Sequence, residues 1–437
     1  MMPTCPRHPA LDSWGDPGQY DRDDPFPLFA QVRSAAPVHE VRLADGHAAW
    51  LVLGYEEARA ALNDPRLSKD MNAALARSGE VVAEGLPGPA LARHMLAVDP
   101  PDHTRLRRLA MPAFSKRRVA ALEPRVRALV DDLLAVLQDR GGTDRPVDLV
   151  SGFAFPLPFT VICELLGVPE PDRADLGRRF RTLLAPYPGP QPPAGAVAAS
   201  DAIVGYLTAL LARKRERPGE DMVTDLVVAA DRDGTLTEQE MLSTIFQLVV
   251  AGHDTTTSLL GNATVALLRH PGQRDALVAD PGLLPGAIEE CLRFDPPVPH
   301  STFRYATEDV DIGGTVIPAF AQVVVSIAAA NRDPARFPEA HDLDIRRAER
   351  NHIAMGHGIH HCLGAPLARM QARIALGALH GRFPRMRLAV QAQELRWGHG
   401  DGLVLRGLTE LPVLLGAPHT VRANGPIGSW STGASSH

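Results

Sequence analysis

A glycine-rich loop runs into a helix in the segment Ala354-Met-Gly-His-Gly-Ile-His-His-Cys-Leu-Gly-Ala-Pro-Leu-Ala-Arg369, and one cysteine, Cys362, stands at the junction. Gly356, Gly358 and Gly364 have no side chain to clash, so the loop can approach a flat or bulky group closely. The start of the helix directs unpaired N–H groups and a partial positive charge toward the cysteine. Both effects favour the thiolate over the thiol.

A cysteine in this setting has three possible uses. An iron porphyrin takes a buried thiolate as its axial ligand. His357, His360 and His361 could instead form a zinc site with Cys362, although structural zinc usually takes four ligands at short regular spacings and no second half-site is present. A buried, inert cysteine is the third interpretation, because cysteine is commonly buried. The segment by itself favours the haem ligand and leaves the other two open.

Three further segments resemble signatures of the cytochrome P450 family, in the family's order and spacing. Val249-Val-Ala-Gly-His-Asp-Thr-Thr-Thr-Ser258 is similar to the oxygen-activating helix, and Glu290-Cys-Leu-Arg293 matches the family's Glu-x-x-Arg. Asp99-Pro-Pro-Asp-His-Thr-Arg-Leu-Arg-Arg108 resembles the haem-propionate helix of bacterial members. The resemblance extends from about residue 20 to about residue 415. Each motif alone is modest evidence, but four in order are highly specific.

The resemblance implies a mainly α protein with the cytochrome P450 fold: a helix-rich single domain with small β-sheets. Haem b would lie between the long oxygen-binding helix and the helix that follows Cys362. We expect residues 1–418 to form this domain. Residues 419–437 are small and polar, and we expect them to be a disordered tail.

Composition bounds the class of protein. The chain has 437 residues, of which 45% are hydrophobic, enough for a large core. Its formal net charge of −6 argues against general nucleic-acid binding. Four cysteines do not make a disulfide framework. The N-terminus lacks the apolar core of a signal peptide, and no run of about 18 apolar residues is uninterrupted. We therefore expect no membrane span and a cytoplasmic location.

Periodicity and turn signals give a coarse map of the chain. Pro25 to Ala35 is typical of a short helix, and the pattern from about residue 55 to 275 is mostly helical. Segments 70–96 and 183–193 are loop-like, and the resemblance makes them lids over the substrate; the alternative is mobile surface loops. Strands are indicated at 38–43, 49–53, 301–305 and 322–327, with a hairpin over 309–318 that turns at Gly313-Gly314.

A long helix should carry the oxygen motif. Thr237 and Glu240 form a capping-box pattern before an apolar run, and the helical pattern continues to about His270. Splitting O2 consumes two protons, and Asp254 and Thr255 supply a carboxylate and a hydroxyl side by side. We predict that these two residues deliver the protons. A polar kink in a buried helix is the alternative, because hydroxyl groups can bond to carbonyls one turn back.

We expect different roles for the three residues that precede Asp254. Gly252 lacks a side chain and should open space where O2 could sit. The resemblance gives Ala251 a contact with the haem. His253 is expected to face away from the haem and to pack or reach solvent, so it is given no role.

Glu290 and Arg293 lie three residues apart and therefore share one helix face. A surface pair would contribute little to stability. The resemblance implies instead a buried pair that holds the loop upstream of the cysteine, with 331–337 as its partner segment. Its role would be structural and haem-retaining, and Cys291 within the motif should be a core residue.

The resemblance also implies four contacts to the haem propionates: His103, Arg107, Arg304 and His360. Arginine suits this task because it binds carboxylates in bidentate fashion. A further set of arginines is either ordinary solvated charge or a positive face for an acidic redox partner; it consists of Arg105, Arg108, Arg117 and Arg118.

Two positions depart from the family pattern. Met355 stands where members usually have phenylalanine, and it still gives the sulfur an apolar, polarisable cover. Phe320 replaces a usual glycine in the Ile-Pro-Ala-Gly turn, which puts the shape of that turn in doubt.

The resemblance implies a monooxygenase that inserts one atom of O2 into a bulky apolar molecule. No flavin or nicotinamide motif is present, so electrons should come from a ferredoxin and its reductase. Segments 49–55, 65–70 and 161–169 resemble the branch that hydroxylates or epoxidises macrolides and related polyketides, with steroids and terpenoids as the alternative substrates. A peroxide-using haem enzyme and a non-catalytic haem or zinc protein remain as rivals.

Overall fold

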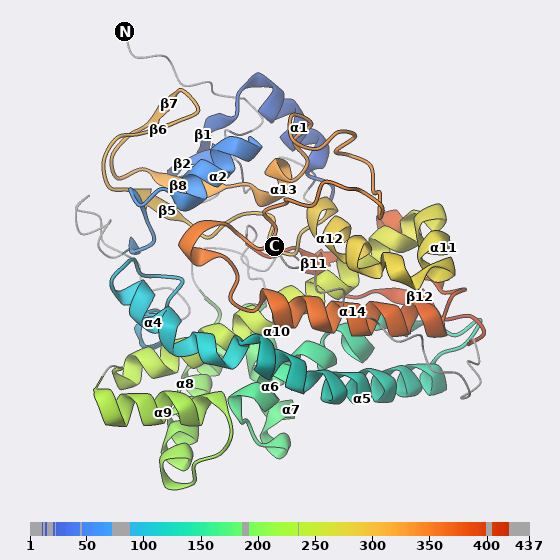
Figure 1. The fold of residues 1–437 in the computed structure, drawn as a ribbon, viewed down its shortest axis with the longest axis horizontal. Coiled ribbons are helices and arrows are strands. Elements are labelled where there is room, and N and C mark those ends of the chain that lie inside the picture. Colours follow the sequence, from blue (N-terminus) through green and yellow to red (C-terminus); the bar gives the residue numbers. More distant parts are fainter. Residues whose placement is uncertain are drawn as a thin grey trace.

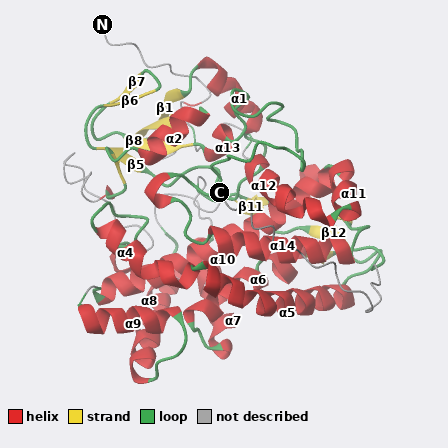
Figure 2. Cartoon of the chain, in the orientation of Figure 1, coloured by secondary structure: helices red, strands yellow, loops and turns green. Residues whose placement is uncertain are grey.

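The computed structural model describes residues 11, 14, 21, 23–43, 46–71, 88–185, 192–234, 236–398 and 404–418. Helices dominate this part of the chain (Figures 1 and 2). The helices are α1 (Phe26–Ala35), α2 (Tyr55–Asn63), α4 (Asp102–Ala110), α5 (Lys116–Arg140), α6 (Pro156–Leu166), α7 (Glu170–Leu184), α8 (Ala194–Glu216), α9 (Met222–Asp233), α10 (Glu238–Arg269), α11 (Pro271–Ala279), α12 (Leu284–Phe294), α13 (Ile327–Ala330) and α14 (Ala365–Arg382).

The strands are short and gather mainly beside α1, α2 and α13 (Figure 1). They are β1 (Val38–Arg42), β2 (Ala48–Val52), β3 (Leu67–Ser68), β4 (Val147–Asp148), β5 (Arg304–Ala306), β6 (Val310–Ile312), β7 (Thr315–Ile317), β8 (Gln322–Val325), β9 (Arg387–Leu388), β10 (Trp397–Gly398), β11 (Gly407–Leu408) and β12 (Pro412–Leu414). The largest sheet has the order β1-β2-β8-β5-β3, and its β2–β8 pair is parallel. The mainly α class with small sheets is therefore confirmed.

Helix α10 is the central element and matches the sequence prediction. Thr237 accepts from the backbone N–H of Glu240, and the Glu240 side chain accepts from Thr237 in return, which completes the predicted capping box. The helix has 32 residues and spans about 48 Å at the standard rise. It packs against α6, α12 and α14 (Figure 1). A helix buried on several sides can hold side chains deep in the molecule.

The main hydrophobic core lies between these helices, and two smaller cores flank the sheet. Leu134 of α5, Leu260 of α10 and Leu376 of α14 belong to the main core. Trp50, Val323 and Phe337 fill one sheet core, while Phe29 and Leu51 belong to the other. The sheet therefore rests on its own apolar layers rather than on the helical core alone.

The hairpin prediction over 309–318 is confirmed. Strands β6 and β7 pair antiparallel, and Gly313 and Gly314 at the turn have φ values of 60° and 80°. This backbone region favours glycine, because a Cβ would clash there. Phe320 in the following turn also has a positive φ, 69°, so it adopts the conformation that the usual glycine reaches without strain.

Helix α8 changes one sequence expectation. It is long and apolar enough to cross a membrane by length and composition, with a mean hydropathy of 1.6 over 18 residues. The search for an uninterrupted apolar run missed it because Asp201 interrupts the pattern. Its Ile203, Leu207 and Leu210 are fully buried, and the helix packs on α7, α9 and α10. With 39% of the apolar window buried, this single helix is weak evidence for a membrane span.

Several predictions fall outside the described residues. Positions 72–87 and 186–191 make up most of the two predicted lids, and residues 419–437 are the predicted tail. The single domain over 1–418 likewise stays a prediction.

Candidate functional site

The cysteine loop has the backbone that its glycines predicted. Gly356 and Gly358 have φ values of 75° and 71°, and a short 3₁₀ helix, η6 (Gly358–His360), leads to Cys362. The Cys362 N–H donates to the carbonyl of Met355 at 2.8 Å, which closes the loop just before α14 begins at Ala365. Met355 packs against the main core. Cys362 therefore stands at the N-terminus of α14, as expected.

The electrostatics of Cys362 differ from the expectation in one respect. Burial raises the pKa of the Cys362 thiol, whereas the backbone N–H groups of Gly364 and Ala365 and the charges of Arg369 and Arg107 lower it. Burial is the larger effect. Loop and helix alone therefore do not lower the pKa of this thiol. A cation bound at the sulfur would reverse the balance, because coordination deprotonates a thiol.

Two observations indicate that the sulfur faces an interior space. The Cys362 side chain is accessible, yet burial dominates its pKa. Ala251 is exposed in the middle of α10, although most residues of that helix are buried. A flat group held between α10 and the cysteine loop would cover both residues.

The hydroxyl groups of α10 bond back along the helix, as predicted. Thr255 Oγ1 donates to the carbonyl of Ala251 at 2.7 Å, and Thr256 Oγ1 donates to that of Gly252 at 3.3 Å. The prediction for Gly252 is wrong. A Cβ there would lie 3.0 Å from Cδ1 of Ile162 in α6, so the missing side chain makes room for helix packing rather than for O2.

His253 faces away from Thr255 and packs, as expected, but it also touches Asp254. The His253 side chain is 1% exposed and lies among Phe155, Phe159 and Phe180. Its Nε2 is 2.9 Å from Asp254 Oδ1. The residue to which the sequence assigned no role is thus in contact with a predicted catalytic carboxylate.

The Glu290–Arg293 pair is buried, so the surface-pair interpretation is wrong. Arg293 Nε and Nη2 each donate to a Glu290 oxygen at 2.8 Å. Arg293 also donates to the carbonyl of Asn331 at 3.0 Å, and Asn331 Oδ1 accepts from Ile353 N–H at 2.8 Å. This chain of bonds reaches the segment before Cys362, as the resemblance implied. Cys291 is a core residue, also as expected.

Two supporting contacts were missed by the sequence. Arg347 Nε lies 3.2 Å from both Glu290 oxygens. Glu289 accepts from Arg369 Nε at 2.7 Å and contacts His352 Nε2 at 3.2 Å. Burial raises the pKa of Glu289, but these partners outweigh burial and lower that pKa to about 2. The cysteine loop and α14 are therefore tied to α12 by two separate ion clusters.

A cluster of basic side chains lies on the other side of the loop. His103 and His360 are in ring contact, with centroids 4.5 Å apart. Burial, followed by the charges of Arg304, His103, Lys69 and Arg107, lowers the pKa of His360 to about 3. Burial also lowers the pKa of Arg304 to about 10. Burial and mutual repulsion thus disfavour positive charge on these side chains, and a bound anion would offset both effects.

Unpartnered atoms in this cluster point to the same kind of ligand. Among the described residues, Arg304 Nε, His360 Nε2 and His94 Nδ1 are buried without a hydrogen-bond partner. Lys69, which sequence reasoning used only for family likeness, is also buried here and donates to Thr302 and Phe303. The two carboxylates of a haem fit this donor set. Arg107 Nη2 donates to the carbonyl of His361 at 2.7 Å, beside Cys362, and its propionate contact stays a prediction.

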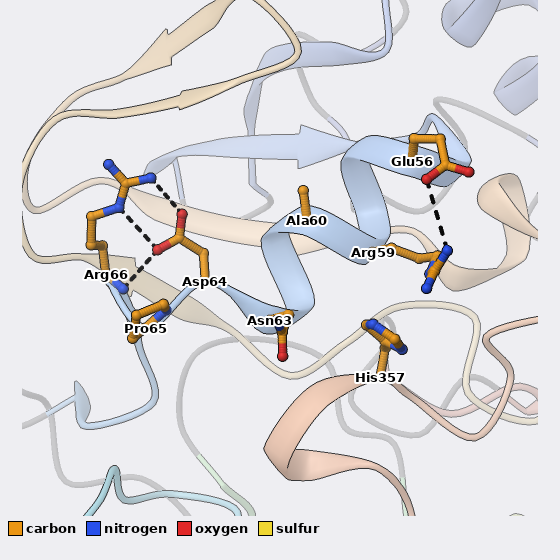
Figure 3. Close-up of a pocket in the computed structure, with 8 residues that line it drawn as sticks. All are labelled: Glu56, Arg59, Ala60, Asn63, Asp64, Pro65, Arg66 and His357. Atoms are coloured by element: carbon orange, nitrogen blue, oxygen red, sulfur yellow. Dashed lines mark hydrogen bonds and ion pairs between the residues drawn. The ribbon is translucent and has the colours of Figure 1, made fainter.

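The zinc interpretation finds no support. In the described part of the chain, no group of three or more His, Cys, Asp or Glu side chains is placed to hold a metal ion. His357 instead borders an open, polar groove on the outer side of the loop (Figure 3). The other groove residues come from α2 and the segment that follows it: Glu56, Arg59, Ala60, Asn63, Asp64, Pro65 and Arg66.

A helix-rich fold, a cysteine at the start of α14, and a basic cluster fitted to carboxylates together define a haem-thiolate protein. The chain belongs to the cytochrome P450 family. The family model for cytochrome P450 matches residues 174–385. Cytochrome P450 monooxygenase PikC of Streptomyces venezuelae is 47% identical over 411 residues, which cover 94% of this chain and 95% of that protein.

Two further likenesses agree. The 6-deoxyerythronolide B hydroxylase of Saccharopolyspora erythraea is 42% identical over 398 residues, covering 90% of this chain and 96% of that protein. The structure of the tirandamycin C-bound P450 monooxygenase TamI superposes with a TM-score of 0.81 at 45% identity, covering 90% of this chain and 97% of that one. The chain is accordingly a cytochrome P450 monooxygenase with haem b as its cofactor. It uses O2 and electrons from a redox partner to oxidise an apolar small molecule.

Proposed function

We propose that this enzyme hydroxylates or epoxidises a macrolide or another polyketide. The observation that carries the proposal is the likeness, over nine-tenths of the chain, to the hydroxylase of 6-deoxyerythronolide B and to the tirandamycin C-bound monooxygenase. The haem, when bound, supplies the activation of O2. We propose that Cys362 is its axial ligand and that His103, Arg107, Arg304 and His360 bind its propionates, with Lys69 beside them. Ala251 would contact the haem face from α10.

The chain's own residues would then supply protons from α10. Asp254 and Thr255 are adjacent, so a proton released by the Asp254 carboxyl group can reach a donor that Thr255 holds in the space between α10 and Cys362. Thr255 Oγ1 donates its own hydrogen to Ala251, which leaves its lone pairs to accept from a donor. Asp254 would recharge the relay, and Thr255 would order the last donor.

A spectral titration tests the substrate class. Macrolides and linear polyketides added to the resting enzyme should displace water from the iron and shift its absorption, with steroids as the matched comparison. Tight binding of steroids with no response to any polyketide would contradict the polyketide proposal and favour the alternative. Turnover with peroxide but not with reduced ferredoxin would favour a peroxide-using enzyme.

We infer that the electron donor is a ferredoxin, that a reductase recharges it, and that both meet the enzyme in the cytoplasm. Arg108, Arg117 and Met111 are exposed in and after α4, and Ile359 is exposed in the cysteine loop, so they would offer an acidic partner basic and apolar contacts. Two other arginines of the predicted set already have partners within the chain. Arg105 donates to Glu240, and Arg118 pairs with Asp225 at 2.8 Å.

Replacing Thr255 with alanine should uncouple the enzyme. Haem content, substrate affinity and NAD(P)H consumption should remain, but electrons should leave as hydrogen peroxide, because the last proton donor is no longer ordered. The product formed per NAD(P)H consumed should fall several-fold, with the loss matched by peroxide. Asp254→Asn should instead slow NAD(P)H consumption, because the proton source itself is weakened.

Thr256→Ala is the matched control. Thr256 also bonds one turn back, but it is 3% exposed and lies on another face of α10. That variant should keep wild-type coupling. Wild-type coupling in Thr255→Ala would mean that the relay runs through other groups, such as a hydroxyl group of the substrate.

A further inference from the structure

His253 occupies an aromatic cage on the side of α10 that packs against α6 and α7. Its ring makes edge contacts with Phe155 and Phe159, with centroids 5.5 and 5.3 Å away, and with Phe180 of α7 at 6.1 Å. The cage gives the imidazole no water to bond. Its two nitrogens must therefore find their partners within α10.

The partners of the two nitrogens fix where protons can reside. His253 Nδ1 is 2.6 Å from the carbonyl oxygen of Val249, and a carbonyl can only accept, so Nδ1 carries a hydrogen. Nε2 is 2.9 Å from Asp254 Oδ1. Two atoms that both presented lone pairs at this distance would repel. One proton therefore lies between Nε2 and Oδ1, as an imidazolium facing a carboxylate or as a neutral imidazole facing a carboxylic acid.

We infer that His253 is a positioning residue for Asp254, which holds the carboxyl group and keeps one proton on it. The inference rests on the proposed proton relay and deepens it. Adjacent residues lie about 100° apart around a helix, so His253 points into the cage while Asp254 stands between the cage and Thr255. The carboxyl group can turn from His253 toward Thr255.

His253 and Asp254 together can deliver one proton and then take up another. The Nε2 proton moves to Oδ1, leaving a neutral imidazole and a carboxylic acid. The acid then releases its proton toward Thr255 and becomes a carboxylate. Nε2 and the carboxylate now hold no proton between them and repel, which favours uptake of the next proton at the Asp254 carboxylate, whose side chain is 24% exposed.

Two substitutions separate positioning from packing. His253→Phe fills the cage with a fourth phenylalanine ring and removes both nitrogens. His253→Gln keeps a side-chain amide within reach of Asp254. We expect His253→Phe to retain haem and substrate affinity, to lower the product formed per NAD(P)H several-fold, and to increase the solvent isotope effect. We expect His253→Gln to recover most of the coupling, which a packing role would not predict.

A second measurement does not depend on turnover. In the reduced, carbon monoxide-bound holoenzyme labelled with ¹⁵N-histidine, the His253 signals are assigned by their loss in His253→Gln. The Nε2 shift of the wild type should be that of a protonated or proton-sharing nitrogen, and it should move to that of a bare nitrogen in Asp254→Ala. An Nε2 shift identical in the wild type and Asp254→Ala would overturn the inference, even if His253→Phe failed to fold.

The experiments distinguish failure of the Asp254–Thr255 relay from failure of the role inferred for His253. If Asp254→Asn slows oxygen reduction while His253→Phe behaves as the wild type, the relay stands and the role of His253 is wrong. If neither Asp254→Asn nor Thr255→Ala changes rate or coupling, the relay itself is wrong.

Discussion

Replacing Cys362 with serine should abolish turnover and the thiolate-type spectrum of the reduced carbon monoxide complex. A serine hydroxyl cannot donate electron density to iron as a thiolate does. The variant should still fold, because Cys362 contributes little to the core and its loop is held by bonds from elsewhere. The measurements are the carbon monoxide difference spectrum, the haem content and the product formed with a reduced redox partner.

Cys163→Ser is the matched control. Cys163 is a fully buried thiol in α6, and burial raises its pKa to about 12, so it serves packing alone. That variant should keep its spectrum and its activity per haem, at some cost in stability. Hydroxylase activity retained in Cys362→Ser would refute the assignment of Cys362 as the ligand.

Features that depend on neighbours in the sequence could be predicted in detail. The capping box of Thr237 and Glu240 and the turn at Gly313-Gly314 arise from residues a few positions apart, so their backbone geometry follows from local chemistry. The cysteine loop is of the same kind, because Gly356 and Gly358 need a positive φ that few other residues adopt.

Features that depend on contacts between distant segments could not be predicted from the sequence. Ile162 fills the space at Gly252 from another helix, and Arg347 reaches Glu290 from 57 residues away. Lys69 joins the basic cluster only because β3 pairs with β5, which begins at Arg304. In the sequence, nothing distinguishes such residues from ordinary ones. Their roles become visible only when the fold brings them next to their partners.

The cysteine loop shows how local and distant features combine. Its glycines give the loop its shape, but burial works against the thiolate, so the loop must be held firmly against a bound iron. That support comes from two adjacent residues of α12. Glu289 accepts from Arg369 of α14, and Glu290 accepts from Arg293 of the same helix. Stability of the α12 cluster is therefore a condition for haem retention.

Replacing Arg293 with alanine should cost haem incorporation more than any single catalytic step. Arg293 is 1% exposed and donates to Glu290 and to the carbonyls of Asn331, Ala340 and Asp342. Its loss removes the closest cation from the buried Glu290 carboxylate, leaves Arg347 as the remaining one, and leaves three carbonyls without this donor, at about 3–5 kcal/mol. Glu290→Ala should act alike, because it leaves Arg293 unpaired. Haem per protein and urea unfolding measure the effect.

The order among variants distinguishes this explanation from a general loss of stability. Arg347→Ala should lose less haem than Arg293→Ala, because Arg347 contacts Glu290 at a longer 3.2 Å and lies nearer the surface. Arg350→Ala, in the same segment, should keep its haem, since its exposed guanidinium donates to the Arg347 carbonyl at a long 3.4 Å. The haem that the Arg293→Ala protein does retain should turn over at a rate near that of the wild type. Normal haem content in both Glu290→Ala and Arg293→Ala would mean that α12 does not hold the cysteine loop.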